Sequence, residues 1–246
     1  MLKKQSVAAA LMAAFLTTSG DGTPLIVARI GNHIIVATNS IDTNGNSRCK
    51  LHFSRNAVVM RATQAASMIF IWPDGRKETI DFDATINDRI KDLDEPVGRL
   101  QDILIEDAQE RIRTILQRYQ PADPDRADIA NDLVSEYVLV GPEHNGFLGV
   151  RAFTLQVTNP QSITFEVEDI TTKLRKGEVV DYTQNEIGTI RAHGQKAVRA
   201  AVYALLKKHD EAAQNLGNKA FSPPYLVMDV THSGRSYLSD PGPCRL

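Results

Sequence analysis

Cysteine is scarce in this sequence, with only Cys49 and Cys244 among 246 residues. Two thiols are too few for a disulfide framework or for a zinc site made of cysteines. An excess of charge is missing too, because 28 basic residues stand against 30 acidic ones and the net charge is −2. A chain without a broad positive field has no general attraction for nucleic acid or anionic lipid, so we expect neither as a partner.

Long apolar runs are also absent. The most apolar one, Val7 to Leu16, is shorter than the roughly 20 residues that span a bilayer. Lys3 and Lys4 precede it, and small polar residues follow it. This three-part layout predicts a secretory signal peptide over residues 1–22, and therefore export to the periplasm or the medium, with no membrane anchor after its removal. The alternative is a buried N-terminal helix.

The small residues that follow the apolar run suggest where a signal peptidase would cut. Gly20 and Gly22 fit cleavage before Thr23, and an earlier cut before Asp21 also satisfies the preference for small residues. The first cut leaves residues 23–246 as a single domain. Export permits a disulfide between the two cysteines, whereas two free buried thiols are the alternative that the sequence leaves open.

Motifs for several large enzyme classes do not occur. There is no P-loop, no GxGxxG, no CxxC and no G-x-S-x-G, and the six histidines form neither HExxH nor a helical ligand pair. We therefore expect no nucleotide, cofactor or metal site. Scattered histidines of this kind are most often surface residues or hydrogen-bonded core residues.

Hydrophobic periodicity predicts an α+β domain. Strands are expected in hairpin pairs, then two helices, further strands, a third helix and a last strand. The expected strands cover 24–30, 33–39, 49–53, 57–63, 68–72, 77–82, 147–157, 162–168, 179–184 and 225–234, and the expected helices cover 97–119, 128–137 and 194–213. Runs of hairpins favour antiparallel sheets, with the helices on their outer faces. The predicted fold is thus a four-layer αββα sandwich of two antiparallel sheets.

Thr23 is the residue with the most distinctive chemistry. A threonine hydroxyl needs a nearby base to become nucleophilic, and an N-terminal threonine carries that base as its own α-amine, whose pKa is about 7.7–8.0. Cleavage after Gly22 would create this arrangement at the start of the first expected strand. The alternative is that Thr23 is merely the first ordered residue of an edge strand.

The order of these features resembles the proteasome β-subunits, which are N-terminal nucleophile (Ntn) hydrolases. The resemblance rests on Thr23, LIVARIGNHIIVATNS, CKLHF with Lys50, AVVMRAT, the two central helices and, near the end, KKHDEAAQNLGNKAFSPPYLVMDVTHSG. It implies the same αββα sandwich and hydrolysis of amide or peptide bonds. It also implies a peptide or small amide substrate and self-association into a homo-oligomer.

The resemblance assigns a role to each candidate residue. Thr23 would be the nucleophile, Lys50 the cation that favours the neutral amine, and Asp210 the acid that orients it. Asn39 stands where the family has a carboxylate that pairs with the lysine. The alternatives are ordinary ones: a solvated strand position for Lys50, a turn residue for Asn39 and a surface helix charge for Asp210.

Two positions depart from the catalytic pattern. Asn39 is neutral, and Ala213 stands three positions after Asp210, where the family has a small hydroxyl residue. The leading hypothesis is an exported threonine-type hydrolase. The competing one is a pseudoenzyme of the same fold that serves as a binding or assembly module.

Overall fold

A computed structural model describes residues 23–40, 49–63, 67–71, 76–119, 124–182, 188–215, 225–240 and 244. These residues form β1 (Ile26–Ile30), β2 (His33–Asn39), β3 (Leu51–Phe53), β4 (Val58–Thr63), β5 (Ser67–Ile71), β6 (Lys77–Asp81), α1 (Phe82–Ile90), α2 (Val97–Leu116), α3 (Pro124–Asp132), β7 (Ser135–Pro142), β8 (Leu148–Asn159), β9 (Thr164–Asp169), β10 (Glu178–Asp181), β11 (Gly188–Arg191), α4 (Gln195–Asn215), β12 (Tyr225–Thr231) and β13 (Gly234–Tyr237). The predicted signal peptide lies outside the described residues, so its removal stays a prediction.

The strands form two main sheets in which every pairing is antiparallel. One has six strands in the order β11-β10-β1-β2-β12-β13, and the other has five in the order β3-β4-β7-β8-β9. Strands β5 and β6 form a separate two-stranded ribbon. Strand β12, which is close to the other end of the sequence, pairs with β2 and thus extends the sheet beyond the first hairpin.

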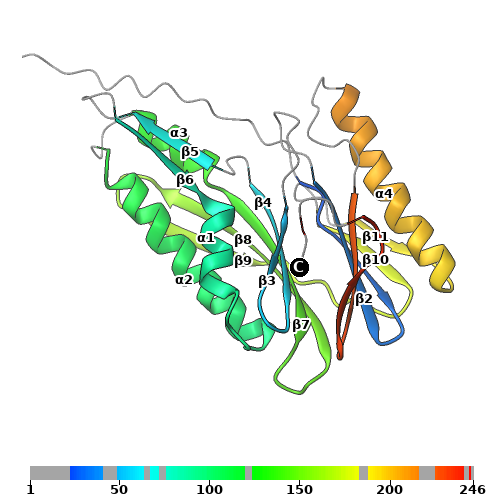
Figure 1. The fold of residues 1–246 in the computed structure, drawn as a ribbon. Coiled ribbons are helices and arrows are strands. Elements are labelled where there is room, and N and C mark those ends of the chain that lie inside the picture. The colour runs from blue at the N-terminus through cyan, green and yellow to red at the C-terminus, as the bar shows by residue number, and fades with distance from the viewer. Residues whose placement is uncertain are drawn as a thin grey trace, which may run out of the picture.

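Three apolar layers hold the molecule together. The middle layer joins the inner faces of the two sheets, and it includes Val36, Met60, Val138 and Met228. A second layer lies between the five-stranded sheet and α1, α2 and α3, and a third lies between the six-stranded sheet and α4. The helices thus cover the two outer faces, and the predicted four-layer αββα sandwich is confirmed (Figure 1).

Strand alternation explains how one sheet serves two layers. On β2, Ile34 and Val36 face the middle layer, while Ile35 and Ala37 face α4. Successive side chains of a strand point to opposite faces, so a strand between two apolar layers must be apolar at every position. This is why β2 carries a run of apolar residues rather than an alternation of apolar and polar ones.

The predicted helix over 128–137 is wrong in its second half. Helix α3 ends at Asp132, and β7 begins at Ser135, so Tyr137 lies on a strand and stacks on Phe153 of the neighbouring strand at 4.7 Å between ring centroids. The apolar residues of β7 face two layers, so they have no period of two that could separate them from a buried helix.

Helix α1 was not expected from the sequence. The Asp81 side chain accepts hydrogen bonds from the backbone N–H groups of Asp83 and Ala84, both at 3.0 Å, and so caps the helix at its first turn. The helix buries Phe82, Ile86 and Ile90 against the five-stranded sheet layer. The strand expected over 77–82 therefore ends at Asp81, because the last strand residue is also the helix cap.

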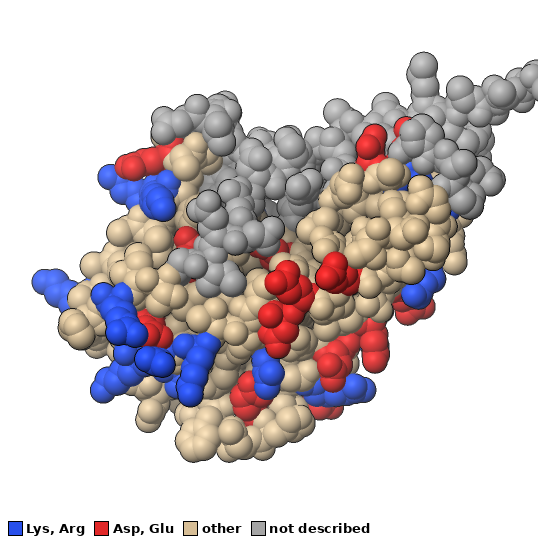
Figure 2. Space-filling view, turned by 180° about the vertical axis from the view of Figure 1, so that it is seen from behind, with Lys and Arg blue, Asp and Glu red and all other residues tan. Residues whose placement is uncertain are grey.

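The surface carries both signs of charge. On the face shown in Figure 2, lysine and arginine side chains lie among acidic ones, and no single sign covers the face. Within the described ranges, no helix is both long and apolar enough to cross a membrane.

Candidate functional site

Asn39 and Lys50 form a contact between the two sheets. Asn39 is the last residue of β2, in the six-stranded sheet, and Lys50 stands directly before β3, in the five-stranded one. The Lys50 ammonium donates a hydrogen bond to Asn39 Oδ1 at 2.8 Å. Asn39 is only 1% exposed, so this bond is shielded from water on the acceptor side. A hydrogen bond of a charged group in such surroundings contributes roughly 1.5–3 kcal/mol.

Thr23 stands at the same end of the six-stranded sheet. It is partly buried, and the buried Pro24 and Leu25 link it to β1. Strand β1 begins three residues after Thr23, and its first residue, Ile26, pairs with Ala37 of β2, two residues before Asn39.

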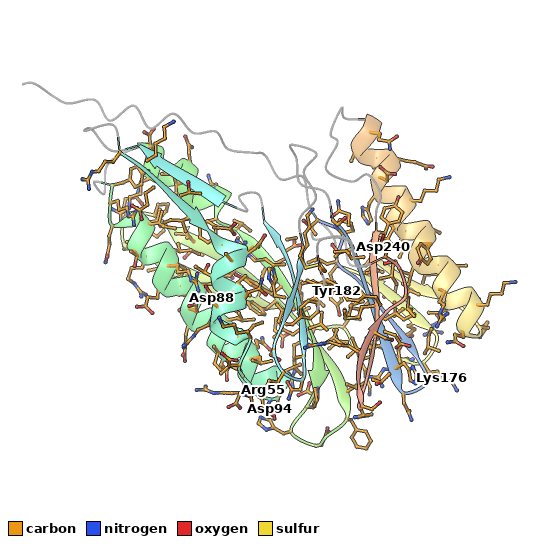
Figure 3. All side chains as sticks on the ribbon, in the orientation of Figure 1. Arg55, Asp88, Asp94, Lys176, Tyr182 and Asp240 are labelled. Atoms are coloured by element: carbon orange, nitrogen blue, oxygen red, sulfur yellow. A yellow bond between two sulfur atoms is a disulfide. The ribbon has the colours of Figure 1, made fainter. Side chains whose placement is uncertain are left out.

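Tyr182 fastens the segment that joins Thr23 to β1. Its backbone N–H donates to the Leu25 carbonyl at 2.9 Å, and its hydroxyl accepts from the Thr172 N–H at 3.1 Å. The ring is fully buried in the middle layer, and Figure 3 labels it between the two sheets. The start of β1 is therefore held by a rigid neighbour and not only by its own hairpin. Burial also raises the pKa of the Tyr182 hydroxyl.

Asp210 contacts the start of β12, the strand next to β2 in the six-stranded sheet. It is on α4, 7% exposed, and accepts hydrogen bonds from the Tyr225 hydroxyl at 3.1 Å and from Gln214 Nε2 at 2.8 Å. Tyr225 is the cross-strand partner of Asn39 in the β12–β2 register. The structure thus brings Asn39 and Lys50 into direct contact and joins Asp210 to their neighbourhood through Tyr225.

The surroundings of Tyr225 keep its hydroxyl protonated. Burial, followed by the negative charge of Asp210, raises the pKa of Tyr225 to about 12. Both causes disfavour a phenolate, because an anion there would lose water and face a carboxylate. Tyr225 therefore remains a hydrogen-bond donor to Asp210 across the physiological range.

Sequence reasoning missed a second anchor of α4. His209 Nε2 and Asp181 Oδ2 are 2.6 Å apart, and both side chains are mostly buried. Asp181 is the last residue of β10 and the cross-strand partner of Ile26, so this pair fastens α4 to the strand that pairs with β1. Nothing in the sequence indicates it, because it depends on β10 pairing with β1. The Asp210–Gln214 contact, in contrast, has the readable spacing of four residues on a helix.

A disulfide joins Cys49 and Cys244, directly beside Lys50. Cys244 is buried in the middle layer, and its carbonyl accepts a hydrogen bond from the Tyr237 hydroxyl. Cys49 packs against the same layer. Of the two alternatives that the sequence left open, the structure has the bonded pair, and the backbone that carries Lys50 is thereby attached covalently to the last described residue.

Ala213, the second departure from the catalytic pattern, is buried at 4% exposure. Its methyl group offers no hydrogen-bonding atom to Asp210 on the preceding turn. The polar contacts of Asp210 come instead from Gln214 and Tyr225.

Comparison with known proteins gives matches among solved structures only. No family model matches the chain, and no curated protein does. Among solved structures, the chain is similar to Anbu (ancestral beta-subunit) from Yersinia bercovieri, with 16% sequence identity and a TM-score of 0.44 over 90% of this chain and 89% of that chain.

The described residues include no group of three or more histidine, cysteine, aspartate or glutamate side chains placed to hold a metal ion. Thr23, Lys50, Asn39 and Asp210 carry a hydroxyl, an ammonium, an amide and a carboxylate respectively.

Proposed function

We propose that the chain is an exported hydrolase that cleaves amide or peptide bonds with Thr23, after removal of residues 1–22 has freed the Thr23 α-amine. The observation that carries the proposal is the Lys50–Asn39 hydrogen bond of 2.8 Å at the sheet end where the Thr23 segment begins. A half-buried ammonium fixed in one position is the group that a self-activating threonine requires beside it.

The proposed reaction has two steps. The neutral Thr23 amine accepts the proton of its own hydroxyl as Oγ1 attacks the substrate carbonyl carbon, and the C–N bond breaks as the leaving amine takes that proton. Water then attacks the resulting ester, gives a proton to Thr23 Oγ1 through the amine, and releases the carboxylic acid. Each step conserves protons and electrons without a cofactor.

The neighbouring groups support this chemistry electrostatically. The positive charge of Lys50 disfavours protonation of the amine and stabilises the negative charge that develops on the substrate oxygen. Asn39 orients Lys50 through its carbonyl oxygen and adds no negative charge of its own. Asp210 acts indirectly, since its described hydrogen-bond partners are Tyr225 and Gln214. In the proposal it holds Tyr225, and with it the start of β12, beside Asn39.

The competing proposal is a pseudoenzyme of the same fold that binds or assembles outside the cytoplasm. The buried Ala213 favours it, because the position offers no hydroxyl to the site. A homo-oligomer is compatible with both proposals, and sedimentation of the mature protein tests it.

The decisive experiment determines the N-terminus of protein recovered from its natural compartment and measures covalent labelling by an electrophile directed at N-terminal threonine. The hydrolase proposal expects a chain that begins at Thr23, labelling that Thr23→Ala abolishes, and labelling that Thr23→Ser retains. A chain that begins elsewhere excludes the self-activated mechanism. A chain that begins at Thr23 but does not label supports the pseudoenzyme.

A further inference from the structure

Arg199 on α4 is a half-buried cation whose charge is not matched by the residues around it. Among the described residues it has no carboxylate within ion-pair distance, and its Nε atom is buried without a hydrogen-bond partner. A guanidinium that has lost part of its hydration without gaining acceptors is favoured energetically by binding an anion. The guanidinium is therefore open to an anion that the described residues do not supply.

A small cavity opens beside this guanidinium. It lies where α4 meets β2 and β12, and its volume is about 90 Å³. Besides Arg199 and Tyr203, one helical turn apart, its lining is aliphatic: Ile35, Val202, Val227 and Leu238. Tyr203 is 40% exposed, so the cavity has an aromatic side chain in contact with solvent as well as an apolar interior.

The chemistry of this lining restricts the ligand. A planar guanidinium matches a carboxylate through two parallel hydrogen bonds, which its two terminal amino groups can donate. The aliphatic walls favour a hydrocarbon tail over a fully hydrated inorganic anion. A cavity of roughly 150 Å³ holds a benzene ring, so one of about 90 Å³ holds about three or four carbons.

We propose that this cavity is a binding site for a short aliphatic monocarboxylate, with the carboxylate on Arg199 and the tail among the aliphatic side chains. The site is separate from the Lys50–Asn39 contact, because neither Asn39 nor Lys50 lines the cavity. The inference does not depend on hydrolase activity. A ligand of six non-hydrogen atoms held by one cation binds with an affinity on the order of millimolar.

The test titrates the full mature protein with sodium butyrate and follows the methyl resonances of Ile35, Val202 and Val227 by NMR. We expect saturable shifts with a millimolar dissociation constant, and roughly tenfold weaker binding of acetate, which lacks two methylene groups. Hexanoate, whose tail exceeds the cavity, should gain nothing over butyrate. A wild-type protein without saturable shifts, or one that binds acetate and butyrate equally, overturns the proposal without any variant.

A matched pair of substitutions tests the role of the guanidinium. Arg199→Gln and Lys196→Gln each remove one positive charge from α4, but Lys196 is exposed and does not line the cavity. Butyrate binding should weaken at least tenfold in Arg199→Gln and stay unchanged in Lys196→Gln. Equal weakening in both variants, or displacement of butyrate by an equal concentration of inorganic phosphate, would show a general anion effect and contradict the proposal.

Discussion

The contact between Lys50 and Asn39 is the smallest unit on which the proposed chemistry depends. Replacing Lys50 by Met should lower the rate of Thr23 labelling by about 10–100-fold, the range expected when one charge-assisted hydrogen bond is lost. Asn39→Ala should lower the rate by a similar factor, and Asn39→Asp, which keeps an acceptor, should not. The rates are measured as second-order labelling constants of the mature protein. If Lys50→Met labels at the wild-type rate, Lys50 has only a structural role.

Tyr225 gives a residue-scale prediction about alkaline pH. Its pKa is raised to about 12 in the fold from an ordinary value of 10, so it binds its proton more tightly when folded. The stabilisation is complete below pH 10 and disappears as pH rises towards 12. It amounts to about 1 kcal/mol after allowance for screening by solvent at this partly exposed site.

Tyr225→Phe should therefore lose less stability between pH 10 and 12 than the wild type does. Urea unfolding at a series of pH values measures the difference. The other tyrosines with raised pKa values remain in both proteins, so their contributions cancel. Parallel alkaline profiles of the two proteins would contradict the assignment.

At the scale of elements, α1 depends on its cap. Asp81→Ala removes an acceptor for two backbone N–H groups and should lower the free energy of unfolding by about 1 kcal/mol, whereas Asp81→Asn should retain most of it. Asp88→Ala is a suitable control, since Asp88 lies later on the same helix and makes an exposed ion pair with Lys91 (Figure 3). Urea unfolding measures the loss of stability in each variant. Equal losses in Asp81→Ala and Asp88→Ala would contradict the stabilising role of the cap.

Helices were predictable from the sequence where one face meets solvent, and hairpins where a turn signal separates two β-prone runs. The stripe of α2 and the hairpins β1–β2, β3–β4 and β8–β9 were predicted close to their observed bounds, and the long third helix was too. The failures have physical causes. Residues around Tyr137 are buried on two faces and show no period, and α1 is a short helix whose start is marked only by its cap.

The candidate site was predictable only in part, because some of its contacts depend on which strands become neighbours. Asn39 and Lys50 were paired by family resemblance, and the structure brings them into contact. Tyr225 and the pair of Asp181 and His209 escaped prediction because each contact needs the order of strands in the six-stranded sheet. Local sequence carries no record of which distant strands become neighbours.

At the scale of the whole molecule, the Cys49–Cys244 disulfide is the longest covalent restraint described. It joins residues 195 positions apart, and removing it should lower the free energy of unfolding by about 2–5 kcal/mol. Urea unfolding with and without reductant measures this loss. The double variant Cys49→Ser/Cys244→Ser should unfold like the reduced wild type and ignore the reductant. A wild type that also ignores it would contradict the prediction.

The same distance along the chain also determines a sequence of events during synthesis. Cys49 leaves the ribosome long before its partner, because translation of the intervening 195 residues takes about 10–40 s at ordinary rates. Strand β2 is likewise synthesised before its partner β12 by nearly the whole of that interval. A nascent chain consequently carries Lys50 without its sulfur bridge and Asn39 without its neighbouring strand. The end of the sheets that holds Lys50 and Asn39 is thus completed last, by the part of the polypeptide that is synthesised last.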